Sequence, residues 1–143
     1  MSAYLRHFAD TFATLNADSL HRLGELYSND VQFRDPLHQL DGLPALRSYF
    51  EKLYTNVEDI RYDLLDVDET APGHGYLRWN LHFRHPRLSR GQPISLQGCS
   101  HLRWAQQVYL HHDYFDAGAL LYEHVPVLGG VIGADHEIDR EVG

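Results

Sequence analysis

The sequence predicts a single α+β domain in which three helices precede a bent antiparallel sheet. Two observations carry this prediction. Apolar residues in the first third recur at three- and four-residue spacing, whereas those of the second half alternate with polar residues. The chain has 143 residues, an ordinary length for one domain around one core. We expect this domain to span residues 1–133 and residues 134–143 to form a charged, disordered tail.

Three segments carry the helical pattern. The first runs from Tyr4 to Leu15, the second from Leu20 to Tyr27, and the third from Leu43 to Tyr54. The residues Ser28 to Asp30 are turn formers, so we expect them to end the second helix. Pro44 is tolerated in the first turn of the third helix.

The strands follow a period of two. A short strand, Val31 to Arg34, ends at Asp35-Pro36 because proline cannot donate a hydrogen bond to a ladder. Four longer strands follow the third helix, and they are Ile60–Asp68, Tyr76–His85, Ile94–Trp104 and Val108–Asp116. Short turns join them, so consecutive strands are expected to pair antiparallel, with the helices covering their apolar face.

Composition excludes several classes of protein. The net charge is −8, from 12 basic and 20 acidic residues, so nucleic acid would be repelled on average. The apolar runs are too short to cross a membrane and the N-terminus lacks the pattern of a secretion signal, so we expect a cytoplasmic protein. Cys99 is the only cysteine, and we interpret it as a buried, inert thiol. The apolar stretch from Ala117 to Ile132 contains Pro126 and a Gly-Gly pair, which predicts a broken helix.

Three pieces of sequence form a recognisable pattern. They are Leu26–Pro36 (LYSNDVQFRDP), Gly42 ahead of the third helix, and Asp113–Asp116 (DYFD) in the last strand. With the order of elements over Tyr4–Leu121, they resemble the nuclear transport factor 2-like superfamily, which includes ketosteroid isomerases, SnoaL-like polyketide cyclases, scytalone dehydratase and limonene epoxide hydrolase. The resemblance is strongest to the SnoaL-like and isomerase-like branch. It implies a cone-shaped, strongly curved antiparallel sheet wrapped around the helices, an internal pocket for a small hydrophobic molecule, and a homodimer through the outer sheet face.

The resemblance places Asp35 where the isomerases have their proton-shuttling aspartate. Desolvation in an apolar pocket raises the pKa of a carboxylate, which makes such a group a usable general base near neutrality. The alternative is that Asp35 is a turn former that bonds its own downstream backbone. The isomerase groups that hold the enolate oxygen are not matched, because Thr11 or Phe12 and Ser100 stand in their places. Steroid isomerisation is therefore not expected.

Asp113 is the second candidate. In the cyclases and the epoxide hydrolase an acid on the final long strand moves protons, and the resemblance gives Asp113 that role. Period two puts His111, Asp113 and Phe115 on one face, where His111 could relay a proton or orient the carboxylate. The alternative is a structural ion pair of Asp113 with Arg78 or Arg103 across strands.

The last strand also contains residue types that can bind a metal ion. Imidazoles and carboxylates are zinc and iron ligands, and the last strand carries His111, His112, Asp113 and Asp116. Two of these face away from the other two, so further ligands would have to come from His38, His101 or His124. We therefore predict neither a metal nor a cofactor.

Together these points predict a cofactor-free enzyme acting on a small, hydrophobic, cyclic molecule by isomerisation, cyclisation or hydration. Asp35 and Asp113 would be the acid/base groups, assisted by His111. The predicted substrate-binding residues are Phe12, Trp79, Leu81, Phe83, Ser100 and Phe115, with Ser100 contacting a substrate oxygen. The alternative is a non-catalytic ligand-binding or accessory domain of the same fold. The outer sheet face is amphipathic, which suits a wet, polar dimer interface.

Overall fold

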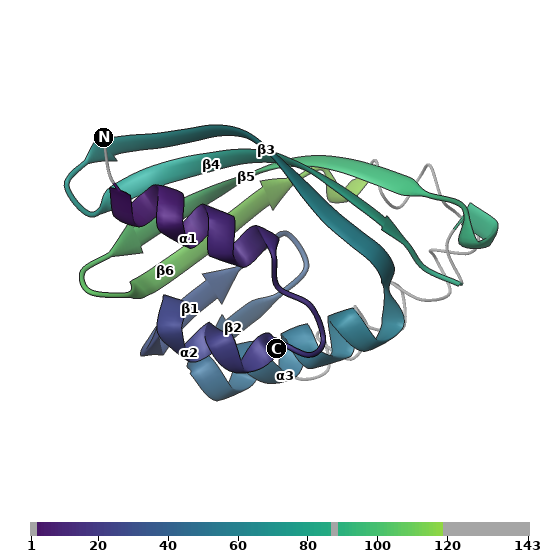
Figure 1. Cartoon of the computed structure of the whole chain (residues 1–143), viewed down its shortest axis with the longest axis horizontal. Helices are drawn as coiled ribbons and strands as arrows, with labels where there is room; N and C mark the ends of the chain where they lie inside the picture. The colour runs from purple at the N-terminus through teal and green to yellow at the C-terminus, as the bar shows by residue number, and fades with distance from the viewer. Residues whose placement is uncertain (1–2, 87–88, 119–143) are drawn as a thin grey trace.

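Helix α1 (Ala3–Ala13) lies across the concave side of a curved six-stranded sheet in the computed structural model, which describes residues 3–86 and 89–118 (Figure 1). A short 3-10 turn, Leu20–Arg22, leads into α2 (Leu23–Leu26), and α3 (Leu43–Asn56) packs against the far end of the sheet. The strands are β1 (Tyr27–Arg34), β2 (Gln39–Asp41), β3 (Glu58–Ala71), β4 (His74–Arg84), β5 (Ile94–Trp104) and β6 (Val108–Phe115). A second 3-10 turn, Ser89–Gly91, precedes β5.

The sheet is mixed, with strand order β2-β1-β6-β5-β4-β3. The antiparallel pairing predicted for the four long strands is confirmed for β3 with β4, β4 with β5, and β5 with β6. The pairing of β1 with β6 is parallel, so the prediction of a wholly antiparallel sheet needs correction. These two strands are far apart in the chain and no hairpin joins them, so nothing local fixes their relative direction.

The second helix is much shorter than the sequence predicts. Residues 23–26 are its only α-helical turn, and the chain is already extended at Tyr27. The turn predicted for Ser28 to Asp30 is wrong, because these residues continue β1. Tyr27 pairs with Val108 of β6, and its side chain is buried, so tertiary packing overrides the local turn preference.

The core lies between α1 and the concave face of the sheet. The helical spacing predicted for α1 is confirmed, since Leu5, Phe8 and Ala9 are each 1% exposed. Leu77 and Trp79 of β4 are buried beneath them, as the alternation in that strand predicts. Each large apolar side chain buried in this way stabilises the fold by roughly 1.5–3 kcal/mol. The core therefore fixes which face of each strand looks inward.

Three further sequence predictions concern features away from the core. None of the helices within residues 3–86 and 89–118 combines the length and apolarity needed to cross a membrane. Cys99 is half-buried on β5, and burial raises the pKa of its thiol, with the charge of Asp113 adding to the effect. The broken helix over Ala117–Ile132 falls outside the described residues from position 119 onward, as does the tail at 134–143.

Gly98 on β5 lies directly opposite Trp79 on β4, and a Cβ at this position would overlap three carbon atoms of the Trp79 ring. We expect Gly98→Ala to lower the free energy of unfolding by roughly 1–3 kcal/mol, because a packed core resists added volume. Chemical denaturation measures this loss. The control is Gly24→Ala, where the nearest atom to the added Cβ is 3.8 Å away. Equal stability of the two variants would contradict the close packing of Trp79 on Gly98.

Candidate functional site

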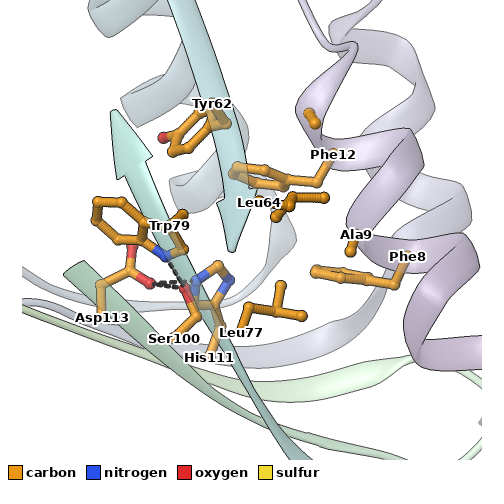
Figure 2. Close-up of a pocket in the computed structure, with 11 residues that line it drawn as sticks. Phe8, Ala9, Phe12, Tyr62, Leu64, Leu77, Trp79, Ser100, His111 and Asp113 are labelled. Atoms are coloured by element: carbon orange, nitrogen blue, oxygen red, sulfur yellow. Dashed lines mark hydrogen bonds and ion pairs between the residues drawn. The ribbon is translucent and has the colours of Figure 1, made fainter. Parts of the chain in front are cut away.

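A small cavity lies between α1 and the concave face of the sheet (Figure 2). Its walls come from α1, β3, β4, β5 and β6. The residues that line it are Phe8, Ala9, Phe12, Ala13, Tyr62, Leu64, Leu77, Trp79, Ser100, His111 and Asp113. The free volume is about 10 Å³, which is room for about one water molecule. The cavity is thus apolar over most of its wall, with its polar groups gathered at the sheet.

The polar groups form one connected network (Figure 2). The Nε2 atom of His111 lies 2.7 Å from Oδ1 of Asp113, and the Ser100 hydroxyl donates to the same oxygen at 2.5 Å. The Trp79 indole N–H donates to the Ser100 hydroxyl oxygen at 2.9 Å. On the other side of the imidazole, the Tyr27 hydroxyl lies 2.7 Å from Nδ1 of His111. Asp113 is therefore held by His111 of its own strand and by Ser100 of β5, which are held in turn by Tyr27 of β1 and Trp79 of β4.

Strand geometry explains why these side chains meet. His111 and Asp113 are two residues apart on β6, so they share the inward face, as the sequence predicts. Ser100 is paired with Asp113 across β5 and β6, which brings its hydroxyl beside the carboxylate. His112 lies on the opposite face, where its ring stacks on Tyr114.

The network fixes the tautomer of His111. Its side chain is 2% exposed, so both ring nitrogens need partners within the protein. With Asp113 ionised, Nε2 carries the proton and donates it to Oδ1. Nδ1 then accepts the hydrogen bond from Tyr27. A neutral imidazole oriented in this way gives both ring nitrogens of His111 a hydrogen-bond partner.

The second oxygen of Asp113 is the chemically available one. The Asp113 side chain is 17% exposed, and within the described part of the chain its hydrogen bonds are made through Oδ1. Among the described residues, Oδ2 therefore keeps its capacity to accept a hydrogen bond or a proton. The alternative of an ion pair with an arginine is wrong, because Arg78 bonds Asp66 instead and Asp113 points to the inner face.

Buried phenols surround this carboxylate. Burial, first of all, raises the pKa of Tyr27, Tyr49 and Tyr62 well above the usual value, and the charge of Asp113 contributes to each. Burial also raises the pKa of Tyr54 to about 12. These phenols stay protonated at neutral pH. They can act only as neutral hydrogen-bonding groups beside the site.

Asp35 lies apart from the lining of this cavity. Its Oδ1 atom accepts hydrogen bonds from the backbone N–H groups of Leu37 and His38 at 2.8 and 2.7 Å. The His38 ring lies 3.1 Å from the same oxygen, and the Tyr49 hydroxyl donates to Oδ2 at 3.5 Å. Although the side chain is only 4% exposed, it has the bonding pattern of the turn former weighed as the alternative.

The predicted substrate-binding residues divide into two groups. Phe12, Trp79 and Ser100 line the cavity, whereas Leu81, Phe83 and Phe115 are half-buried elsewhere and do not line it. The single hydrogen of the Ser100 hydroxyl is donated to Asp113, so a hydrogen bond from Ser100 to a substrate oxygen would have to replace that contact.

Sequence reasoning missed several residues of the site. The helical spacing of Leu20 to Tyr27 predicts a helix, whereas Tyr27 begins β1. Tyr62 and Leu64 alternate on β3, and this period-two spacing was the signal that could have placed them on the inner face. Phe8 and Phe12 are four residues apart on one face of α1, so the spacing that predicts Phe12 as a lining residue also predicts Phe8.

Tyr27→Phe tests the network. The substitution leaves the buried Nδ1 of His111 without its hydrogen-bond donor, so we expect the free energy of unfolding to fall by about 1–3 kcal/mol. Chemical denaturation at neutral pH measures the loss. Tyr114→Phe, at a side chain whose residue is 51% exposed, is the control and should change stability little. A stability loss no larger for Tyr27→Phe than for this control would contradict the network.

Tyr54→Phe should have the opposite effect. Among the described residues its buried hydroxyl has no hydrogen-bond partner, so removing it should raise stability by about 1 kcal/mol at neutral pH. The folded pKa of about 12 lies above the unfolded value of about 10, so the folded chain holds this proton more tightly. The part of the folding stability that depends on this pKa difference is fully present below pH about 10 and is lost as the pH rises towards about 12. The advantage of Tyr54→Phe should therefore widen across this window, as followed by denaturation at each pH. A constant difference would argue against the buried phenol.

Comparison with known proteins gives the family. Residues 6–109 match the SnoaL-like domain, whereas no curated protein sequence matches the chain. A protein with a ketosteroid isomerase-like fold from Catenulispora acidiphila, solved in complex with trimethylamine, is 14% identical, with a TM-score of 0.72 over 89% of this chain and 96% of its own. A protein from Shewanella putrefaciens described as a SnoaL-like polyketide cyclase is 16% identical, with a TM-score of 0.71 over 87% and 97%. An epoxide hydrolase of the LEH-like type from M. tuberculosis is 10% identical, with a TM-score of 0.69 over 92% and 96%. At these identities the solved structures show the fold, an α+β nuclear transport factor 2-like fold. With more than half of its length matched by the family, the chain belongs to the SnoaL-like domain family.

Proposed function

We propose that this protein binds a small hydrophobic molecule in the cavity beneath α1 and that Asp113 acts on it as a general base, without a cofactor. One observation carries the proposal. Asp113 stands at the polar end of an apolar cavity, with Oδ1 held by His111 and Ser100 and Oδ2 left for a ligand. A positioned carboxylate of this kind is the group that proton-transfer reactions require.

The chemical step follows from the positions of these groups. Oδ2 of Asp113 would take a proton from a carbon next to a carbonyl group, or from a water that attacks the substrate. In an isomerisation the same oxygen would return the proton to a different atom. The two hydrogen bonds at Oδ1 hold the carboxylate in one orientation, which lowers the entropy lost on reaching the transition state.

His111 is a positioning residue in this proposal. Its Nε2–H group faces Asp113, and its Nδ1 atom is held by Tyr27. The imidazole therefore fixes the orientation of the carboxylate before the proton is taken. The rings of Phe33 and Phe12 pack against the buried imidazole and hold it in this orientation.

Asp35 receives a structural role instead. Four hydrogen-bond donors surround its carboxylate, and two of them belong to the backbone of the turn that follows it. Asp35 and Asp113 both act electrostatically on Tyr49. Burial raises the pKa of Tyr49, and the charges of the two carboxylates raise it further. We therefore assign the proton transfer to Asp113 and the turn between β1 and β2 to Asp35.

The descriptions of similar solved structures agree with proton chemistry without choosing a reaction. One is described as a polyketide cyclase, one as an isomerase and one as an epoxide hydrolase. Reactions of these three kinds can use general acid/base catalysis. Isomerisation, cyclisation and hydration of a small hydrophobic substrate are the reactions that we propose to test.

A second candidate function is ligand binding without turnover. The observation that favours it is the small size of the cavity, about 10 Å³, because a substrate could enter only if lining side chains moved. In that case the network from Tyr27 to Asp113 would serve stability alone. The homodimer through the outer sheet face and the cytoplasmic location remain predictions under either function.

Asp113→Asn separates the two functions. Purified protein is mixed in D₂O with a panel of small cyclic ketones and enones, and NMR follows exchange of carbon-bound protons, while chromatography follows hydrolysis of small epoxides. If Asp113 is the base, Asp113→Asn should lower the rate with an active compound by about 10²- to 10⁴-fold. Thermal stabilisation by the same compound should remain.

The matched control is Asp66→Asn. It removes a carboxylate from the other face, where Asp66 is half-exposed and bonded to Arg78. Its rate should equal that of the wild type. A rate unaffected by Asp113→Asn would overturn the assignment of the base. Stabilisation of wild type and Asp113→Asn alike, with no turnover of any compound, would favour the ligand-binding function.

A further inference from the structure

Two phenol hydroxyls beside the cavity make no hydrogen bond to any other residue within 3–86 and 89–118. They belong to Tyr54 of α3 and to Tyr62 of β3. The oxygen of Tyr54 is buried, and Tyr62 is one of the lining residues of the cavity. Nearly all buried polar groups in folded proteins have a partner, so each exception needs an explanation. A donor without a partner at the edge of a cavity is a group that a bound molecule can satisfy.

The two phenols lie in the same region as Asp113. Burial raises the pKa of Tyr62 most, and interactions with Tyr54 and then with Asp113 raise it further. Such interactions weaken with distance, so the three groups are neighbours. In Figure 2 the Tyr62 hydroxyl lies on the same side of the cavity as Trp79 and Asp113, opposite α1. Asp113 takes both of its hydrogen bonds from other side chains, so the carboxylate and the phenols face one space without bonding each other.

The ring of Phe12 occupies the space that a cyclic ligand would need. Its centroid lies 5.4 Å from that of Tyr62 and 5.9 Å from that of His111, which are the spacings of packed aromatic rings. Phe12 is only half-buried, whereas Phe8 on the same helical face is 1% exposed. Phe12 is therefore the lining side chain with room to move. A six-membered ring in its place would lie between the Tyr62 phenol and the imidazole that holds Asp113.

The charges of the site select the kind of acceptor that a ligand can carry. An ionised Asp113 repels anions, and the net charge of −8 on the chain adds to this effect. Burial raises the pKa of both Tyr54 and Tyr62, so their hydroxyls remain neutral donors. A neutral O–H group is a suitable partner for a neutral oxygen such as that of a carbonyl group. The cavity thus fits an apolar ring that carries one uncharged oxygen acceptor.

We propose that Tyr62, together with Tyr54, donates hydrogen bonds to an oxygen atom of the ligand, and that the ligand is a small cyclic molecule with a carbonyl group. This inference deepens the proposed function and rests on it, because the ligand occupies the cavity that contains Asp113. The two phenols act as ligand-binding donors. They select a ketone over a hydrocarbon of the same shape, because only the ketone satisfies their hydroxyls.

The unpaired hydroxyl of Tyr54 lowers the stability of the free protein. A buried hydroxyl without a partner loses its hydration and gains nothing in return, whereas a phenylalanine has no such group to satisfy. Features that lower stability are typical of sites that serve binding or catalysis. Tyr54→Phe should therefore make the protein more stable and weaken ligand binding at the same time. Damage to the fold cannot produce this combination.

Two probes of almost the same shape test the proposal. Cyclohexanone has a carbonyl oxygen, and methylenecyclohexane has in its place a CH₂ group that accepts no hydrogen bond. Dissociation constants are measured by NMR titration of the full-length protein. The wild type should bind cyclohexanone at least about fivefold more tightly than methylenecyclohexane, which is the effect of one typical hydrogen bond. Cyclohexanecarboxylate, which is an anion, should bind more weakly than cyclohexanone.

Phenylalanine variants identify the donors. Tyr62→Phe and Tyr54→Phe should each weaken the binding of cyclohexanone by about fivefold and leave that of methylenecyclohexane unchanged. The matched control is Tyr114→Phe, because Tyr114 lies on the outer face of the sheet and is 51% exposed. Its affinity for both probes should equal that of the wild type. Circular dichroism shows whether each variant is folded.

Infrared spectroscopy observes the hydrogen bond itself. The probe is cyclohexanone labelled with ¹³C at the carbonyl group, whose stretching frequency falls when its oxygen accepts a hydrogen bond. The frequency of the bound probe should be lower in the wild type and in Tyr114→Phe than in Tyr62→Phe. A purely structural role of Tyr62 would leave this frequency unchanged.

The outcomes separate this proposal from the role of Asp113. Asp113→Asn should retain the preference for cyclohexanone, because both phenols remain. If Asp113→Asn abolishes proton exchange while both phenol variants bind cyclohexanone as the wild type does, the phenol proposal is overturned and the base stands. If the phenol variants lose the preference and the wild type turns over no compound, the phenols are supported and the base is not. Equal affinity of the wild type for the two ring probes, or binding of neither, would overturn the phenol proposal.

Discussion

The hydrogen-bonded chain from Tyr27 through His111 to Asp113 is the interaction on which both the fold and the site depend. Tyr27 belongs to β1, while His111 and Asp113 belong to β6, so the chain joins the two strands whose pairing is parallel. An imidazole that is 2% exposed loses its hydration on folding, and only two well-placed partners offset that cost. The aromatic rings of Phe8 and Phe33 pack edge-on against the same imidazole. The register of the sheet and the orientation of the carboxylate are therefore set together.

Much of the fold could be predicted because the local spacing of apolar residues determines it. The face of α1 and the inward residues of β4 follow directly from spacing, since burial of apolar side chains decides them. The start of β1 at Tyr27 could not be predicted in this way. Its extended conformation depends on β6, more than 80 residues later, whereas Ser28 to Asp30 locally favour a turn.

The site shows the same division between local and distant causes. His111 and Asp113 were found because two-residue spacing on a strand is a local property. The cavity lining was only partly predicted. Leu81 and Phe83 lie on the same face of β4 as Leu77 and Trp79. However, α1 covers only the part of the strand that contains Leu77 and Trp79, so Leu81 and Phe83 do not line the cavity. Parity gives the face of a sheet, and only the position of the covering helix gives the part of that face that lines a cavity.

Two carboxylates that look equivalent in the sequence have different surroundings in the structure. Three of the four donors around Asp35 belong to its own turn and the fourth is the Tyr49 hydroxyl, and together they use the acceptor capacity that a base would need. The donors around Asp113 are the side chains of Ser100 and His111, and both bond the same oxygen, Oδ1. Within a family that supports several reactions on one fold, this difference decides where chemistry is proposed.

The most direct measurement of the account is the tautomer of His111, read from ¹⁵N NMR of imidazole-labelled protein near pH 8. The account predicts a neutral ring with its proton on Nε2, donated to Asp113, and an unprotonated Nδ1 that accepts from Tyr27. A proton found on Nδ1 instead would mean that Asp113 is not held by His111. That result would contradict both the network and the proposed base.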